Sequence, residues 1–504
     1  MFDNGSLVDI VGSENVIDDN ETLKVYAKDE SFAKPIMPRC VVKLTSGGGP
    51  RENYSEEARK IIAWANDTLT PLVPISSGAP HFRGDSIPSA PGSVMVDCSQ
   101  MKKVVEIDRK NKVVVVEPGV TFGELALEIE RQDLRINTPL LPRRSKSVIG
   151  SILEREPGTM PKYQLDSGYP LCCVEGIFGG GYRFKTSATV GLSSAKEQWE
   201  MSGGQPMANA IWWTNPVRLI QGSQGTMGIV TKAMLKCEIL PRLQKPFLVG
   251  SSDINSMIAL SHSLIKTRLV NECFILNDVN LAAILAKNPE EFGILKGALP
   301  AWVIFYSIAG YNYYPEEKIG YQEKHMMRLA SDTGLEPVDG LGEISASELM
   351  ELLQKPSNEQ YWKMKPKGSC QDIFFLTLTD KITGFVDLVQ NMAENHDYAA
   401  ADVGIYLQPI MQGGAWHCEF NIFYDPKDTD ESSLVRQLFD DTSRSLLAQA
   451  AFFSRPYGLW AELAYQRDKE SAKMLKKVKE ILDPNNVMNP GKLVFSDVAT
   501  REDK

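Results

Sequence analysis

No two cysteines of this sequence are spaced as CxxC, although eight occur among its 504 residues. Iron–sulfur clusters and structural zinc sites need closely spaced thiolates, so the sequence predicts neither. The five histidines are also scattered and form no HxxxH pair, which leaves open only a metal site assembled from distant segments. Scattered single cysteines are typical of buried thiols in a reducing compartment.

The sequence also lacks the features of nucleic-acid-binding and membrane proteins. Its formal net charge is -10, so bulk electrostatics gives no attraction to nucleic acid. No uninterrupted apolar run is long enough to cross a bilayer. The first residues, MFDNGSLVDIVGSENVIDDNE, are acidic and lack the basic-then-apolar pattern of a leader. We therefore expect a cytoplasmic protein, unless a leader has been removed.

The composition is that of a globular protein, with 43% hydrophobic and 23% charged residues. Short strands and helices alternate over the first half of the chain. From about Pro241 the pattern changes to longer helices, over 254–269 and 316–334, with strands such as 301–310 between them. This change predicts an α+β protein with a second α+β domain in its later part.

One helix of the first half has a clear beginning. Thr121 and Glu124 have the spacing of a capping box, in which each side chain bonds the other residue's backbone N–H. Leu125, Leu127 and Ile129 are expected to give this helix its apolar surface.

Two segments of small residues indicate where a ligand approaches the backbone. They are PISSGAPHFRG, residues 74–84, and QGSQGTMGIVT, residues 221–231. Glycine and small residues let backbone N–H groups converge on an anion. Neither segment is a Walker loop or a Rossmann GxGxxG, and either one alone is also compatible with a surface loop. Together they favour a long, phosphate-containing ligand. A third segment, 138–161, is rich in prolines and basic residues, and we expect a loop there.

Three motifs carry a family resemblance. They are VTFGEL after VVVVEPG, RLIQGSQGTMGIVTKAMLK, and the C-terminal ILDPNNVMNPGKLVF. Over residues 7–236 and 456–495 the chain resembles the vanillyl-alcohol oxidase / p-cresol methylhydroxylase superfamily. Within it, the chain is most similar to glycolate oxidase FAD subunits and D-lactate dehydrogenases. The resemblance implies a p-cresol-methylhydroxylase-type FAD-binding domain, an α+β cap domain that contacts the substrate, and a C-terminal segment that returns to the FAD domain. The expected parts are residues 1–236, 237–455 and 456–504.

The resemblance also implies a cofactor site. The segment 74–84 is expected to bind the FAD pyrophosphate through its backbone, although Ser76 and Ser77 stand where the family commonly has glycine. His81 is displaced from the family's usual attachment position, so we expect non-covalent FAD. The expected cofactor residues are Pro74, Ile75, Ser76, Ser77, Gly78, Ala79, Pro80, His81, Ser147, Gly150, Ser151, Gly222, Ser223, Gly225, Gly228, Ile229, Val230 and Asn489.

Catalytic residues are expected from the cap domain and the C-terminal segment. A histidine at the start of the strand near 417 can orient a substrate alcohol or take its proton. For each of the five catalytic candidates named next, a purely structural role is an equally good interpretation. Tyr457 is the strongest candidate for a catalytic role. The candidates are His417, Tyr457, Glu462, Tyr465 and Arg467. The paired-histidine pattern of the family's metal-dependent members is absent, and we expect no metal.

The sequence therefore predicts an FAD-dependent oxidoreductase. It would oxidise a small alcohol, 2-hydroxy acid or phenolic compound by hydride transfer to flavin N5. Electrons would then pass to an external acceptor, which is a protein, a quinone or oxygen. Two alternatives stay open: an FAD-bearing electron-transfer subunit of a larger complex, and a non-redox enzyme of the alkylglycerone-phosphate synthase type. A homodimer and a hetero-complex are both compatible with the sequence.

Overall fold

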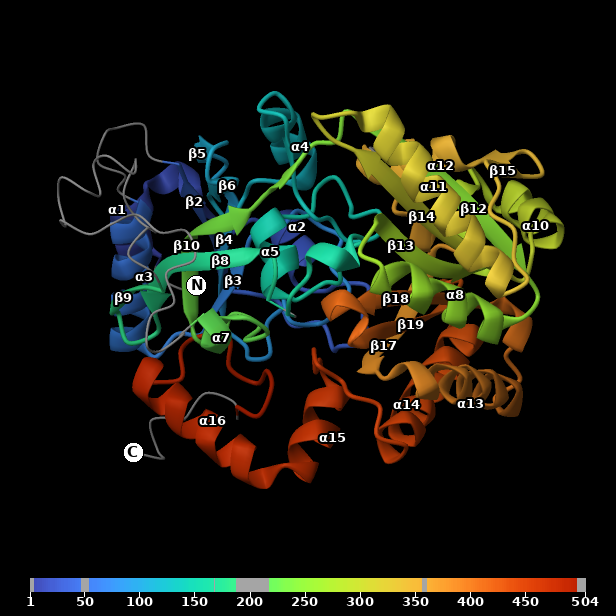
Figure 1. Cartoon of the computed structure of the whole chain (residues 1–504). Coiled ribbons are helices and arrows are strands. Elements are labelled where there is room, and N and C mark those ends of the chain that lie inside the picture. The colour runs from blue at the N-terminus through green and yellow to red at the C-terminus, as the bar shows by residue number, and fades with distance from the viewer. Residues whose placement is uncertain (1–3, 47–53, 167, 187–216, 356–359, 496–504) are drawn as a thin grey trace.

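A four-stranded and a five-stranded β-sheet are formed by the first half of the chain and a six-stranded sheet by the second half (Figure 1). The described residues also form two small sheets of two strands each. The computed structural model describes residues 4–46, 54–166, 168–186, 217–355 and 360–495. Helices and strands are mixed in both halves, which confirms the predicted α+β class. Within the described ranges no helix is both long and apolar enough to span a bilayer.

The first sheet leads into the segment 74–84. Its strand order is β1 (Val16–Ile17), β2 (Cys40–Thr45), β4 (Val94–Gln100) and β3 (Leu72–Ile75). Strands β2, β4 and β3 are parallel, and α3 (Tyr54–Thr68) packs on them through buried residues such as Ile61 and Ile62. The short helices α1 (Gly5–Val11) and α2 (Asn20–Tyr26) precede this sheet. Because β3 ends at Ile75, the small-residue segment begins at the carboxyl edge of parallel strands, where ligands commonly bind.

The second sheet carries the segment 221–231 at one of its strands. Its order is β5 (Val104–Asp108), β6 (Val113–Val116), β10 (Gly228–Lys236), β8 (Leu171–Phe178) and β9 (Arg183–Lys185). All its pairs are antiparallel. The last glycine of the segment, Gly228, is the first residue of the central strand β10. The segment therefore lies at the end of a rigid element.

Two expectations about local structure need correction. The capping box of Thr121 and Glu124 begins α4 (Phe122–Glu130) as predicted, but Leu127 is 60% exposed while Leu125 and Ile129 are buried. Leu127 is two positions from each of them, which places it on the opposite side of a helix. The segment expected to be a loop also contains a helix, α5 (Val148–Leu153), capped by the Ser147 side chain.

The large sheet has six antiparallel strands. Its order is β12 (Leu243–Ser251), β14 (Trp302–Gly310), β13 (Val270–Asn277), β18 (Val403–Ile410), β19 (Ala415–Tyr424) and β17 (Ser369–Thr377). Helices on one face share a hydrophobic core with it: α8 (Ile254–Lys266), α11 (Pro315–Asp332), α13 (Ile382–Asn395) and α14 (Thr429–Ala448). The other face packs against α9 (Asp278–Leu285) and α12 (Ala346–Gln354). A stretch of this second face on β17 and β19 carries polar residues instead.

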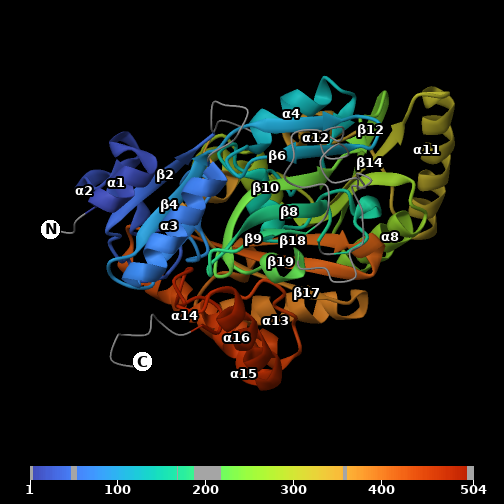
Figure 2. The same ribbon diagram turned by 90° about the vertical axis from the view of Figure 1, so that its left-hand side faces the viewer.

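The end of the chain lies against the first half. Helices α15 (Leu459–Arg467) and α16 (Lys469–Leu482) follow the large sheet, and the next residues return to β3 (Figures 1 and 2). The backbone of Leu72 donates to Val487 at 2.7 Å and accepts from Asn489 at 2.8 Å. The buried ammonium of Lys479 bonds the carbonyls of Thr226 and Met488. Lys492 also donates to the Gly84 carbonyl at 2.6 Å, so the C-terminal residues contact both small-residue segments. The division at residues 236 and 455 stays a prediction.

Candidate active site

A cavity of about 1400 Å³ lies where the two halves of the chain meet. Three segments line most of it: 74–86, 139–156 and 220–230, with Tyr361, Asp372 and Tyr457 contributed by the later part. We call it the large cavity. The two small-residue segments, 74–84 and 221–231, therefore face the same space.

Most of the expected cofactor residues line the large cavity. These are Pro74, Ile75, Ser76, Ser77, His81, Gly150, Gly222, Ser223, Gly225, Gly228, Ile229 and Val230. The structure does not place the others on its wall: Gly78, Ala79, Pro80, Ser147, Ser151 and Asn489. Three of these have supporting contacts instead. Ser147 caps α5, Ser151 donates to Glu156, and the Asn489 amide donates to the carbonyls of Asp85 and Gln224 at 2.8 and 2.7 Å.

The residues present fit a bound pyrophosphate and flavin. In the described part of the chain, the backbone N–H groups of Ser77 and His81 donate to no protein acceptor. The buried hydroxyl of Ser86, on the wall of the large cavity, also has no partner there. Burial, together with the positive charges of Arg143 and Lys146, lowers the pKa of His81 to about 3, so its ring is neutral. Unused donors around a long cavity are what an anionic cofactor requires.

Gly225 is the point at which the two small-residue segments touch. Its φ is +72°, and a Cβ added there would lie 2.7 Å from Cγ of Pro74. The backbone at Gly225 therefore lies close to the segment 74–84 and also lines the large cavity.

We predict that Gly225→Val loses FAD. The strained backbone would cost about 1–3 kcal/mol, and the new side chain would displace Pro74. The measurement is flavin content of the folded protein. Gly181→Val is the matched control, since Gly181 has φ +84° and open space around its Cβ. Full flavin content in folded Gly225→Val would contradict this.

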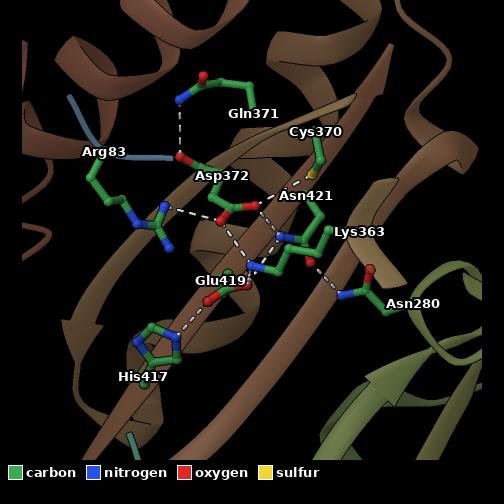
Figure 3. A network of polar contacts seen from close by, with 9 residues as sticks. All are labelled: Arg83, Asn280, Lys363, Cys370, Gln371, Asp372, His417, Glu419 and Asn421. Atoms are coloured by element: carbon green, nitrogen blue, oxygen red, sulfur yellow. Dashed lines mark hydrogen bonds and ion pairs between the residues drawn. The ribbon is translucent and has the colours of Figure 1, made fainter. Parts of the chain in front are cut away.

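Polar side chains on β17 and β19 form a charged network beside the large cavity (Figure 3). Alternate residues of a strand share one face, and the pairing aligns Asp372 with Asn421 and Leu376 with His417. Asp372, Glu419, Asn421 and His417 therefore lie on the same face of the large sheet.

Lys363 lies at the centre of this network. Its ammonium contacts Glu419 and lies 2.8 Å from Asp372. Arg83 reaches in from the segment 74–86 and lies 3.0 Å from the same Asp372 oxygen (Figure 3). Asn421 donates to Asp372 at 2.7 Å and to Glu419 at 3.0 Å. Two cations and two carboxylates thus neutralise one another, and they tie the large sheet to the cavity.

The charges of the network are held by their neighbours. Burial alone would lower the pKa of Lys363, but Asp372 and Glu419 raise it well above its usual value. Burial would raise the pKa of Glu419, but Lys363 and the hydrogen bond from His417 hold it well below its usual range. Burial lowers the pKa of His417, whose Nε2 lies 3.1 Å from Glu419. His417 is therefore neutral and donates to Glu419.

A smaller pocket of about 370 Å³ adjoins the network. It shares Arg83, Leu140, Glu156 and Tyr361 with the large cavity, and Lys363, Glu419, Tyr406 and Arg455 also line it. We call it the small pocket. A ligand there would lie next to whatever fills the large cavity. This arrangement suits a substrate beside a cofactor.

Arg455 differs from the other cations of the small pocket. It is only 4% exposed, and its guanidinium lies 3.9 Å from the centre of the Phe374 ring. Among the described residues, no carboxylate lies at ion-pair distance and no acceptor takes a hydrogen bond from it. Its planar set of N–H donors is therefore free to bind a carboxylate or phenolate in the pocket.

Glu156 lines both the large cavity and the small pocket. Ser151 donates to one of its oxygens, and the other has no hydrogen bond within the described ranges. Burial would raise its pKa, but Lys146, Arg455 and Arg83 outweigh burial and hold the pKa below the usual range. An ionised carboxylate with a free oxygen therefore lies at the junction of the two sites.

The predicted catalytic residues are only partly gathered here. Tyr457 lines the large cavity, and burial raises its pKa well above the usual value, so it keeps its proton. His417 lies next to Glu419 and lines neither the large cavity nor the small pocket. Glu462, Tyr465 and Arg467 lie on α15 and are also absent from both linings. Their catalytic roles stay predictions.

Sequence reasoning missed several residues of the site: Arg83, Lys363, Asp372, Glu419, Tyr361 and Glu156. A signal for some of them exists. His417, Glu419 and Asn421 occupy alternate positions of an otherwise apolar strand, and Asp372 pairs with Asn421 on the neighbouring strand. Polar residues on one face of a buried strand need partners, and such a pattern indicates a functional face.

Comparisons with known proteins agree with this site. A family model described as an FAD binding domain matches residues 53–165, and one described as the C-terminal domain of FAD linked oxidases matches residues 380–493. The chain is 21% identical over 500 residues to glycolate oxidase subunit GlcD of Bacillus subtilis, covering 98% of this chain and 97% of that protein. It is 22% identical to the mitochondrial D-lactate dehydrogenase [cytochrome] of Arabidopsis thaliana, covering 87% and 72%.

The fold is also that of a solved flavoenzyme. The structure of p-cresol methylhydroxylase with substrate bound superposes with a TM-score of 0.81 at 16% identity, covering 97% of this chain and 96% of the other. The two domain matches, the relatives and the fold fit the p-cresol-methylhydroxylase-type superfamily of FAD-linked oxidases that the sequence resembled. The chain is an FAD-binding oxidoreductase, an FAD-linked dehydrogenase or oxidase, with the two-domain fold that the sequence predicted.

Proposed function

We propose that this flavoprotein oxidises a small substrate carrying a carboxylate or phenolate next to, or conjugated with, the carbon that is oxidised. The observation that carries the proposal is Arg455, a buried guanidinium with free donors in a pocket beside the cofactor cavity. A buried charge without a partner is costly, so such a group is favoured where a ligand supplies the partner. When bound, FAD supplies a hydride acceptor at flavin N5.

The residues of the small pocket divide the work. Arg455 binds and orients the anionic group, and Phe374 fixes the plane of its guanidinium. Glu156 accepts the proton that leaves the substrate oxygen as the C–H electron pair departs as hydride. Tyr457 donates a hydrogen bond from the large cavity. The network around Lys363 keeps the pocket wall in place, because removing one partner of a buried ion pair costs about 3–5 kcal/mol.

Two substrate classes match this description. By their names, the bacterial and plant relatives act on glycolate and D-lactate, which are 2-hydroxy acids, whereas p-cresol methylhydroxylase acts on a phenol. Both classes present an anionic oxygen group to a cation. The free arginine supports either class, and the aromatic residues Tyr361 and Tyr406 of the small pocket suit a phenolic ring.

The test is anaerobic flavin bleaching with a panel of 2-hydroxy acids and 4-alkylphenols. We expect the purified protein to be yellow, to bleach with one class, and to release its flavin on acid precipitation. Colour retained in the pellet would contradict non-covalent binding. Bleaching only by neutral alcohols would contradict the proposal. No bleaching with any member would favour an electron-transfer subunit or a non-redox enzyme. Reoxidation by oxygen, a quinone or a cytochrome then identifies the external acceptor.

A further inference from the structure

An open groove of about 1580 Å³ shares part of its lining with the site. It shares Pro142, Arg143 and Tyr361 with the large cavity, and it shares Tyr361 and Trp362 with the small pocket. Tyr361 lines all three spaces. The groove therefore reaches the point at which the substrate pocket and the cofactor cavity meet.

The groove is positively charged. Lys102, Arg143, Arg144 and Lys365 line it, and among its described lining residues the only carboxylate is Glu124. Glu124 is already paired with Lys102 at 2.9 Å. The chain as a whole has a net charge of -10, so this positive lining stands out from the rest of the molecule. A cleft lined by one sign of charge concentrates ligands of the opposite sign.

Arg143 and Arg144, the two arginines of the groove, differ in the contacts that they make with the rest of the protein. Arg143 donates to the Gly78 carbonyl at 3.2 Å and lies over the Phe82 ring, so it is tied to the segment 74–84. Arg144 is exposed and makes no hydrogen bond or ion pair with any described residue. It is absent from the linings of the large cavity and the small pocket. The charge of Arg144 can therefore be changed without removing a contact of the site.

We propose that this groove is the entrance to the active site and that its positive charge attracts small anions toward the flavin. This inference rests on the proposed function for the identity of the anion, a carboxylate or phenolate substrate. The electrostatic part of the inference does not depend on the proposed function. Any small charged reductant that reaches the flavin through the groove is attracted or repelled by the same positive charges. Two reductants of opposite charge can therefore test the groove without a known substrate.

The experiment is stopped-flow reduction of the FAD-loaded protein by dithionite, whose reducing species is an anion, and by reduced methyl viologen, a cation. At about 10 mM ionic strength we expect Arg144→Glu to slow the first reaction by about threefold to tenfold and to speed the second, within the range of electrostatic steering. Both effects should vanish at about 0.5 M salt, where the Debye length falls to a few ångströms. Flavin content and melting temperature should not change.

The matched control is Lys110→Glu, an equal charge change at an exposed turn of the same half of the chain and outside the groove. Equal effects of the two variants, or none, would overturn the proposal. Slowing of both reductants would also overturn it, because the change would then be structural. An effect seen only with a large acidic acceptor protein would make the groove a docking surface instead. If no compound of the substrate panel bleaches the flavin, reduction by dithionite and by reduced methyl viologen still tests whether the groove attracts anions.

Discussion

Arg455→Met is expected to raise KM for the anionic substrate by about 10²–10³-fold while the protein keeps its FAD. Each hydrogen bond to a charged group contributes about 1.5–3 kcal/mol, and the guanidinium can offer two to a carboxylate. Methionine fills the volume and leaves the contact with Phe374 apolar. Steady-state kinetics on flavin-normalised protein gives the result. The KM of Arg455→Lys should lie between those of the wild type and Arg455→Met, because a lysine keeps the charge without the planar pair of donors.

The control for this prediction is Arg436→Met. Arg436 also lies over an aromatic ring, that of Phe32, but it is exposed and lines neither the large cavity nor the small pocket. An uncharged amide of the same substrate supplies a second control, since its turnover should depend little on Arg455. An unchanged KM for the acid in Arg455→Met would remove the basis of the proposed function.

The second large effect is expected from Glu156→Gln. A positioned base contributes about 10²–10⁴-fold to rate, so substrate-driven flavin reduction should slow within that range. Glutamine keeps the shape and still accepts from Ser151, so FAD content should be unchanged. The low pKa of Glu156 means that the carboxylate is ionised at neutral pH. In the wild type the rate should therefore fall only as the pH drops through that low pKa, and the variant should lack this fall.

Stopped-flow reduction across a pH series measures both features of Glu156. Glu323→Gln is the matched control, since Glu323 pairs with Lys245 on the large-sheet half and is absent from both linings. A Glu156→Gln enzyme that reduces at the wild-type rate would show that another group takes the proton. Asp85, on the wall of the large cavity, would then be the next residue to change, because burial and Glu154 raise its pKa to about 7.

The parts of the site that the sequence could predict are local ones. The segments 74–84 and 221–231 are recognisable because small residues follow or precede an apolar strand, and the structure brings them together at Gly225 and Pro74. The helix after Thr121 was predictable from its capping box. The class of fold followed from the same local patterns and from the motifs at both ends of the chain.

The parts that could not be predicted depend on how distant strands align. The grouping of Asp372 with Glu419 and His417 follows from the register between β17 and β19, which no local pattern specifies. Glu156 was missed because its segment was expected to be a loop, whereas α5 and the residues after it direct it to the junction of two pockets. Arg455 becomes informative only when its surroundings show that its donors are free. These are properties of tertiary contacts.

The contacts of Asn489 and Lys479 constrain the order in which this protein can mature. Asn489 bonds the carbonyls of Asp85 and Gln224, and Lys479 bonds that of Thr226. A ribosome adds these two residues hundreds of residues after the segments that they hold. While the chain is still being synthesised, its first half lacks the contacts that close the cofactor cavity. We therefore expect flavin capture only after Lys479 and Asn489 have been made, and a chain truncated before Lys479 should not retain FAD.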